Sequence, residues 1–514
     1  MSKTIIIIGA GLAGLSAALQ AAENGCNVKL VSSFPSERAQ SVMAEGGINA
    51  ALNTKDENDS PEEHFTDTIK AACGLADPNA VWGMTQAAPE LVHWLLKLGV
   101  QFNMSGYDDV DLRNFGGQKK KRTAFAQSDT GKQIMTAMID AVRRKEASGM
   151  VERFSHHSFL TLRLCDNICC GCVIRDEYSQ ETVELPGDAV IVATGGMHGL
   201  FGNTTGSLSN TGEVTAELFR LGVPLANGEM IQYHPTTVKC GGKRMLISEA
   251  ARGEGGRLFA MKDGKQWYFM EEKYPELGNL MPRDITAREI WKVSHESEVF
   301  LDMTEISDEI ISNKLSGLAD DCMTYLHKDI RKEPVSVLPG IHYFMGGILV
   351  DEQHRTPIQN LYAAGECCAQ YHGANRLGGN SLLGALYGGR VAAKSACEQA
   401  DVVDLSCATQ IDFPPASQIS EIKQLNKVMQ ETMGVVRNEN TLLNGIQTVQ
   451  ALTGNLPLLG VAVLKSALAR KESRGAHWRE DYPKSNDDDY LKTTVARFDG
   501  KQIQISFVPV PERR

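Results

Sequence analysis

No stretch of the sequence is apolar over the length that a membrane-spanning helix needs. Such a helix takes about 20 consecutive apolar residues, and the apolar runs of this 514-residue chain are all shorter. Basic residues do not outnumber acidic ones: the formal net charge is −11, which argues against a general affinity for nucleic acid. Internal repeats and low-complexity tracts are also absent. What remains is a chain with 42% apolar and 22% charged residues, as is typical of a soluble enzyme.

The cysteines also lack the spacing of a disulfide-linked protein. The twelve cysteines are mostly scattered, which predicts reduced thiols in a cytoplasmic protein rather than a disulfide framework. They form one cluster, at Cys165, Cys169, Cys170 and Cys172, for which an iron–sulfur or zinc site is one interpretation. The surrounding residues have the pattern of a hairpin that leads into a buried strand, where cysteine is commonly a packing residue. We therefore predict no metal site.

A nucleotide-binding pattern is present at the N-terminus. Residues 4–8, TIIII, predict a short buried strand, and residues 9–14 then give the spacing G-x-G-x-x-G at the start of a helical pattern. The helix is expected to end at Gly25, and residues 28–31 predict the next strand. Glycines at this spacing permit a tight turn and the close approach of a pyrophosphate. With no credible cleavage site here, we interpret this segment as part of the fold and not as a signal peptide.

Other residues favour FAD over NAD as the dinucleotide. NAD-binding proteins usually place Asp or Glu after the second strand, whereas this chain has a serine pair at residues 32–33. A later strand within residues 189–196 and the acid Glu366 at a strand end suit FAD. Residues 380–381, Asn-Ser, then open an Ala- and Gly-rich helical run. There we expect a side chain to cap the helix and the helix end to attract an anion.

The chain is too long for one core, so two to four domains are expected. Helical patterns cover residues 61–100 and 132–149, and the intervening loop carries four basic residues, Lys119–Arg122, which we interpret as a solvated charged segment. Residues 236–340 lack nucleotide patterning and indicate an inserted domain. The predicted division is 1–235 and 341–400 for the two parts of a flavin-binding domain, 236–340 for the insertion, 405–480 for a helical domain and 481–514 for a strand-like tail.

Four segments offer polar side chains to a small anionic substrate. They are residues 233–237 (YHPTT), 248–256 (SEAARGEGG) and 282–284 (PRD), and the pair His342 and Arg376. Each alone has an ordinary structural explanation. A single His is more often a hydrogen-bonded core or surface residue, and Glu249 and Arg252 have the spacing of a helix-face ion pair.

Together, the motifs resemble the flavoprotein subunits of fumarate reductase and succinate dehydrogenase, and the related L-aspartate oxidases. The resemblance covers almost the whole chain, through GAGLAGLSAAL, AEGGINAAL, FGGQKKKRTAFAQSDTG, VIVATGG, HPTT, SEAARGEGGRLF, PRDITARE, HYFMGGI, LYAAGE, HGANRLGGNSLL and ARKESRGAHWREDYP. It implies an α/β fold, with a Rossmann-like FAD-binding domain, an inserted α+β capping domain and a C-terminal helical domain. It also implies an FAD-dependent C4-dicarboxylate oxidoreductase of the fumarate reductase type.

The resemblance further implies a catalytic site of seven residues: His234, Ser248, Glu249, Arg252, Arg283, His342 and Arg376. The two histidines, Ser248 and Arg376 would hold the substrate carboxylates, for which a permanently charged guanidinium is suited. Reduced flavin N5 would deliver a hydride, and Arg283 would donate a proton relayed from Arg252 through Glu249. Arginine is a poor acid in water, so this role needs a charged, desolvated site.

The cofactor contacts that the resemblance implies are Gly9, Ala10, Gly11, Ala13, Gly14, Ser32, Gln40, Ser41, Gly46, Gly47, Glu213, Glu366, Ser381 and Leu382. Glu213 stands where relatives usually have Asp. Relatives in membrane complexes carry a His that bonds covalently to the flavin, and Gln40 replaces it here. An amide nitrogen cannot attack the flavin methyl as imidazole does, so we predict non-covalent FAD. Because covalent linkage raises the flavin potential in this family, its loss favours fumarate reduction.

Two alternative functions agree with parts of the sequence. L-aspartate oxidase also binds FAD non-covalently, but that family has a Glu that meets the substrate ammonium where this chain has Phe115. A non-catalytic, electron-carrying flavoprotein would need FAD but not the four polar segments. The resemblance also implies an iron–sulfur protein subunit as partner, and electron transport in anaerobic respiration. The expected location is cytoplasmic, or peripheral at the inner face of the membrane through partner subunits.

Overall fold

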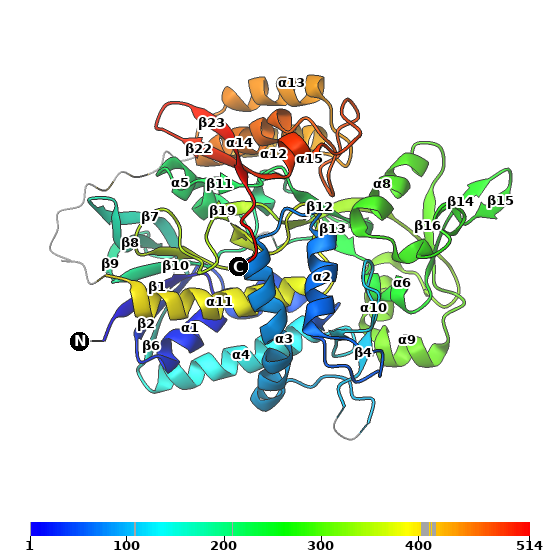
Figure 1. The fold of residues 1–514 in the computed structure, drawn as a ribbon, viewed down its shortest axis with the longest axis horizontal. Coiled ribbons are helices and arrows are strands. Elements are labelled where there is room, and N and C mark those ends of the chain that lie inside the picture. The colour runs from blue at the N-terminus through cyan, green and yellow to red at the C-terminus, as the bar shows by residue number, and fades with distance from the viewer. Residues whose placement is uncertain (1, 107–108, 208, 402–410, 412, 414–417) are drawn as a thin grey trace.

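The computed structural model describes residues 2–106, 109–207, 209–401, 411, 413 and 418–514 (Figure 1). An α/β part built mainly from the N-terminal half lies at the lower left of the view, and the inserted segment lies at the right in green. The C-terminal helices, in orange and red, lie above both. The mixed α/β architecture predicted from the sequence is confirmed.

A five-stranded parallel sheet forms the centre of the α/β part, in the order β20-β10-β1-β2-β6. Its central strand β1 is buried on both faces, as expected for an apolar, β-branched strand of a parallel sheet. The strand bounds are β1 (Thr4–Ile8), β2 (Asn27–Ser32), β6 (Val151–Ser155), β10 (Ala189–Val192) and β20 (Leu361–Ala363).

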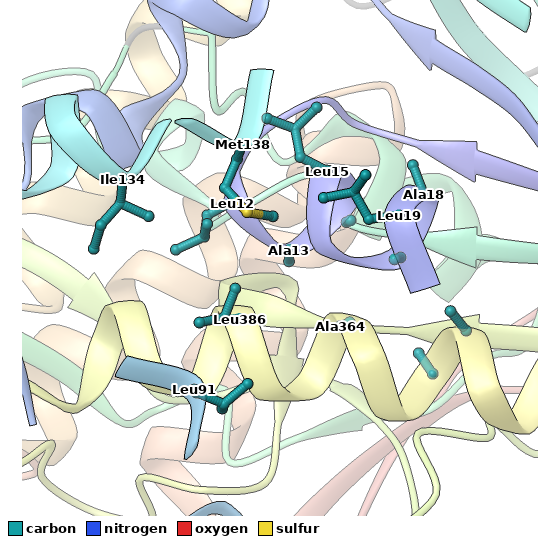
Figure 2. Packing of buried hydrophobic residues seen from close by; sticks show 14 of the residues in the cluster. Leu12, Ala13, Leu15, Ala18, Leu19, Leu91, Ile134, Met138, Ala364 and Leu386 are labelled. Atoms are coloured by element: carbon teal, nitrogen blue, oxygen red, sulfur yellow. The ribbon is translucent and has the colours of Figure 1, made fainter. Parts of the chain in front are cut away.

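Beside this sheet, helix α1 (Leu12–Glu23) packs against both α4 (Thr130–Ala147) and α11 (Asn380–Gln399). Figure 2 shows Leu12 of α1 lying between Met138 of α4 and Leu386 of α11. Small residues let the helices approach closely, since a Cβ at Gly389 would lie 2.3 Å from the carbonyl oxygen of Ala13. The predicted helical region 61–100 forms two helices, α2 (Pro61–Ala71) and α3 (Pro78–Leu98), because Asp77 caps a new helix start.

Two small antiparallel sheets complete the α/β part, one against α11 and the other against the central sheet. One joins β3 (Ile48–Asn49), β4 (Leu112–Arg113) and β5 (Thr123–Ala124), and the other joins β7 (His157–Cys165), β8 (Ile168–Asp176) and β9 (Thr182–Pro186). Cys169, Cys170 and Cys172 are buried in β8 as free thiols, whereas Cys165 is not among the free thiols. In the described residues, no group of three or more His, Cys, Asp or Glu side chains is arranged to hold a metal ion.

The chain enters and leaves the inserted segment through paired strands, because β12 (Ile231–Cys240) runs antiparallel to β18 (Leu338–Phe344). The predicted boundaries near residues 235 and 340 fall inside these two strands, and the domain division stays a prediction. The segment has a core of its own, which includes Leu258, Ile290 and Leu301. Its other elements are β13 (Lys243–Leu246), α6 (Glu249–Gly253), β14 (Arg257–Lys262), β15 (Lys265–Trp267), α7 (Phe269–Lys273), α8 (Arg283–Val293), β16 (Val299–Asp302), α9 (Asp308–Lys314), α10 (Ser316–Asp321) and β17 (Val335–Ser336).

The C-terminal part contains three main helices and a hairpin. The helices are α12 (Ile419–Thr432), α13 (Glu439–Gln450) and α14 (Asn455–Ala469), followed by the short α15 (Asp487–Tyr490). The predicted start of this helical region at 405 lies outside the described residues. The hairpin of β22 (Lys492–Phe498) and β23 (Ile503–Pro509) completes a sheet with β11 (Leu225–Ala226), β19 (Gly347–Leu349) and β21 (Cys368–Ala369). The tail thus pairs with strands distant in sequence.

The prediction that Lys119–Arg122 forms a solvated segment is wrong for Arg122. Its guanidinium is fully buried and lies 2.8 Å from Asp59 and 3.0 Å from Asp67. Lys119 and Lys121 are exposed, as expected for a charged loop. Within the described part of the chain, no helix combines the length and apolar character needed to cross a bilayer.

Candidate active site

A cavity of about 800 Å³ lies where the α/β part meets the inserted segment. Its walls come from the glycine-rich turn after β1, the loops around residues 40–47 and 366–382, and the region of α6 and α8. All predicted cofactor contacts except Gly14 line it, and so do all predicted catalytic residues except Arg252. The structure thus gathers the predicted cofactor and catalytic residues around one cavity.

The turn after β1 fits an anionic dinucleotide. Gly9 has a φ of +110°, and a Cβ there would lie 2.3 Å from the carbonyl oxygen of Ala193, so the turn requires glycine. Gly14 packs α1 onto this turn instead of lining the cavity, since its Cβ would lie 1.9 Å from the Gly9 oxygen. The N-cap of α1 is Gly11, which has no side chain to offer, and the backbone N–H of Leu12 donates to Ser41 Oγ at 3.3 Å. The buried hydroxyl of Ser32 has no partner among the described residues. Free helix N–H groups and an unpartnered hydroxyl are suited to phosphate and ribose oxygens.

A second helix end, that of α11, also opens at the cavity. The expected capping by Asn380 is wrong, because its Oδ1 accepts from Asn49 at 2.7 Å and its Nδ2 donates to Thr68 at 2.9 Å. The N-cap is Gly379, which has no side chain to offer. The N–H of Asn380 donates to the carbonyl of Leu377 at 3.2 Å, and the positive end of the helix then faces the cavity at Ser381 and Leu382, which line it.

Three further cofactor candidates are placed at the cavity wall. Glu366 follows β20, and its Oε1 accepts from the backbone N–H of Phe344 at 3.1 Å. Glu213 begins α5 (Glu213–Arg220). The side-chain oxygen of Gln40 accepts from the backbone N–H of Ser207, which fixes its amide in place. The residues present thus fit a bound FAD.

At the inserted segment, a buried carboxylate joins two arginines. Glu249 Oε2 accepts from Arg283 Nε at 2.8 Å and lies 2.6 Å from Nη2, while its Oε1 lies 3.4 Å from Arg252 Nη2. Gly116 also donates its backbone N–H to Oε1, at 3.1 Å. Burial acts to raise the pKa of Glu249, but the two arginines outweigh it, and the pKa lies below its ordinary value. Glu249 is therefore ionised, and Arg252 lies behind it, away from the cavity.

The opposite wall carries Arg376 and two histidines. Arg376 is buried over the ring of Tyr343, 4.4 Å from the centroid, and its Nε has no hydrogen-bond partner among the described residues. The rings of His234 and His342 lie 5.1 Å apart, and His234 Nε2 also lacks a partner there. Burial, and then the charge of Arg283, lower the pKa of each of these three side chains. A bound anion would relieve this repulsion between positive groups.

Three positioning residues are absent from the sequence-based prediction. Gln232 is fully buried and accepts from Arg283 Nη1 at 3.2 Å, while its amide donates to the carbonyl of Arg376 at 2.8 Å. Thr205 contacts His342 Nδ1 at 2.8 Å, and Tyr343 supports Arg376. Gln232 adjoins the YHPTT segment, but no local pattern in the sequence links it to residues 283 and 376.

Ser248 and Phe115 complete this end of the cavity. Ser248 is the N-cap of α6, and its hydroxyl accepts from the backbone N–H of Ala250 at 3.4 Å. Phe115 is buried, lines the cavity and closes on the glycine loop, since a Cβ at Gly46 would lie 2.8 Å from its ring. An apolar ring therefore occupies this part of the wall.

A parallel sheet, with helices α1 and α11 both beginning at one cavity and a chamber of buried polar side chains beside them, defines an FAD-dependent oxidoreductase. The FAD binding domain family matches residues 4–382, and the fumarate reductase flavoprotein C-terminal family matches residues 453–513. The chain therefore belongs to the succinate dehydrogenase and fumarate reductase flavoprotein family.

Individual relatives agree with this assignment. The chain is 38% identical to the succinate dehydrogenase flavoprotein subunit of Bacillus subtilis (strain 168), over 100% of this chain and 98% of that one. It is 33% identical to the L-aspartate oxidase of Pyrococcus furiosus, over 94% and 97%. Among solved structures, a chain of E. coli quinol fumarate reductase superposes with a TM-score of 0.89 at 27% identity, over 99% and 97%.

Proposed function

We propose that this chain is the flavoprotein subunit of a fumarate reductase-type enzyme and converts fumarate to succinate. The observation that supports this most is the buried guanidinium of Arg376, whose Nε has no partner among the described residues and which faces a cavity with two unprotonated histidines. A cation that is buried without a counter-ion is unfavourable. A dicarboxylate would supply the missing negative charge, with bidentate geometry at the arginine.

In this proposal, FAD supplies a hydride equivalent to one carbon of the substrate double bond. Arg376, His342, His234 and Ser248 bind the two carboxylates and hold the substrate still. Arg283 holds a proton against the other carbon, and its contact with ionised Glu249 both orients the guanidinium and offers a route for reprotonation from Arg252. The inserted segment excludes water from this step.

We further propose that FAD is bound non-covalently. Gln40 stands at the position of the linking histidine and is engaged with the backbone of Ser207. Denaturation with acid should release all flavin into the supernatant, where its absorbance is measured. Flavin that remains with the precipitated protein would contradict this part of the proposal.

L-aspartate oxidase is the alternative function. A relative with this activity is similar over most of the chain. Against it stands the apolar ring of Phe115 in the wall, where the oxidase family has a carboxylate for the substrate ammonium. The test compares fumarate turnover with reduced viologen against oxidation of L-aspartate by the same preparation. Fumarate turnover is expected; rapid aspartate oxidation without it would reverse the assignment.

We also propose an iron–sulfur protein as electron partner, because relatives are named as flavoprotein subunits and the described residues hold no metal-binding cluster. Co-purification of a brown protein with iron and acid-labile sulfide is expected. A preparation that reduces fumarate with its physiological donor as a single chain would contradict it.

A further inference from the structure

Glu45 is a second carboxyl in the cavity, and its surroundings differ in charge from those of Glu249. It lies between the 3-10 helix η2 (Gln40–Met43) and β3, directly before Gly46 and Gly47, and lines the cavity. Its Oε2 atom is shielded from solvent and has no hydrogen-bond partner among the described residues. Two arginines act on Glu249, whereas the carboxyl of Glu45 is influenced by one, Arg113.

Acidic groups approach Glu45 from two neighbouring elements. Burial raises the pKa of its carboxyl to about 8, and Asp321 at the end of α10 and Asp129 at the N-cap of α4 add to the increase. The Ser248 hydroxyl acts in the opposite direction by hydrogen bonding. Asp321 itself faces Asp320 and Lys243, and the Cys322 thiol lies nearby.

Arg113 of β4 is the cation that acts on Glu45, and its charge is shared with other groups. Its Nη2 donates to the carbonyl of Gln127, and its guanidinium lies 3.8 Å above the ring of Phe125. Glu254 and Asp111 also attract it. The carboxyl of Glu45 therefore lacks a dedicated counter-ion, and an uncharged carboxyl is the form that this environment favours.

We propose that Glu45 must be protonated for the cavity to accept a dicarboxylate. This inference rests on the proposed function, because it concerns the same substrate. The neutral carboxyl presents no charge to a dianion held at Ser248. The ionised carboxyl adds a negative charge in a buried site, where repulsion is poorly screened. Glu45 thus sets the upper pH limit for substrate binding, whereas Glu249 remains ionised throughout.

The experiment measures binding of malonate, a non-reactive dicarboxylate, to the FAD-loaded protein through the change in flavin absorbance. If only the protonated form binds, affinity should fall up to about tenfold per pH unit above about pH 8. Glu45→Gln, a neutral isostere, should bind malonate with no such fall over the same range. Calorimetry of the unsubstituted protein in buffers of different ionisation enthalpy should show uptake of about half a proton per malonate near pH 8, rising towards one at higher pH. This test does not depend on any variant.

Asp321→Asn is the matched control, because it separates an effect of Asp321 on the pKa of Glu45 from direct repulsion between Asp321 and malonate. Removing the charge of Asp321 lowers the pKa of Glu45, so the fall in affinity should begin at a lower pH. If Asp321 instead repelled malonate directly, the substitution would tighten binding at every pH and overturn the inference.

The remaining outcomes distinguish a failure of the role of Glu45 from a failure of the proposed function. An unchanged pH profile in Glu45→Gln, or malonate binding without proton uptake, overturns the role of Glu45 and leaves the proposed function intact. Failure of the unsubstituted protein to bind malonate at any pH overturns both. L-aspartate binding that tightens as Glu45 ionises would overturn the inference and favour the oxidase, because the carboxylate would then meet an ammonium.

Discussion

Arg283 illustrates how one guanidinium can be held in two directions. Glu249 accepts from one side of it, and Gln232 accepts from the other. The group is thereby fixed over the cavity while its charge is balanced by a buried carboxylate. Such fixed geometry is what a proton donor requires, because a misplaced donor loses most of its effect.

Replacement of Arg283 by Ala should lower fumarate turnover by about 10²- to 10⁴-fold, the usual contribution of a positioned acid, while FAD content stays unchanged. Turnover and flavin-to-protein ratio are measured on the same sample. Arg288→Ala is the control on the same helix, since Arg288 lies 4.0 Å above the ring of Trp478 and does not line the cavity. A variant at 283 that retained full turnover would refute the role.

For individual residues, sequence motifs identified the side chains that line the cavity but not those that support them. Arg376 and His342 stand in recognisable segments. The bond of Gln232 to Arg283 joins residues distant in the chain, and the charge state of Glu45 depends on Asp321 and Asp129. Neither relation has a local signature, because both arise from tertiary packing.

Among the elements, the turn between β1 and α1 is the one most dependent on a single residue. Gly9 combines a positive φ with a backbone oxygen that already occupies the space of a Cβ. Gly25, at the other end of α1, has a φ of +78° and open space around it. A substitution at Gly25 therefore introduces backbone strain alone, whereas one at Gly9 introduces both backbone strain and a steric clash.

Gly25→Ala should lower the free energy of unfolding by about 1–2 kcal/mol, the cost of a left-handed non-glycine residue, and leave FAD binding intact. Gly9→Ala should cost more and also release FAD, because either the turn or Ala193 must move. Denaturant unfolding and flavin retention after gel filtration measure the two effects. Equal losses for both variants would show that strain alone governs this turn.

Periodicity was sufficient for the elements whose signals are local. The strand predicted over residues 4–8 is β1, and the helix expected after it ends at Glu23, just before Gly25. Asn380 does not cap α11, because its buried side chain is hydrogen-bonded to Asn49 and Thr68 instead. A cap preference is a local tendency, and tertiary hydrogen bonds override it.

In the whole molecule, the C-terminal part is joined to the α/β part by buried charges as well as by a shared sheet. Arg470 Nε lies 2.7 Å from Glu229, and its Nη1 lies 2.8 Å from Glu472, with all three side chains fully buried. Arg470 also donates to the carbonyl oxygens of Tyr490 and Lys492. One side chain therefore links α14, β22 and the segment after β11.

Arg470→Met should lower the free energy of unfolding by about 3–5 kcal/mol, because it leaves the buried carboxylate of Glu229 without its cation and leaves Glu472 paired with Arg474 alone. Urea unfolding followed by tryptophan and by flavin fluorescence should shift together, since the network spans both parts. Arg497→Met is the control: Arg497 is an exposed residue of β22, and a change within about 0.5 kcal/mol is expected. Separate transitions in the Arg470 variant would instead show that the parts unfold independently.

The overall architecture followed from motif order, but the contacts between parts did not. The strand-like character of residues 503–509 is visible in the sequence, whereas the pairing of β22 with β11 is not. The burial of Arg122 was missed for the same reason, since its partners Asp59 and Asp67 lie far from the basic run. Long-range pairing leaves little trace in local composition.

The position of β11 in its sheet has a consequence for biosynthesis. This strand lies between β19 and β22, so one of its edges is covered by residues that leave the ribosome long after the strand itself. Until residue 492 has emerged, the nascent protein exposes unpaired backbone groups at that edge, which is a site for wrong pairing between chains. Completion of this sheet therefore waits until β22 has been synthesised, and a chaperone that shields the edge would protect it during the interval.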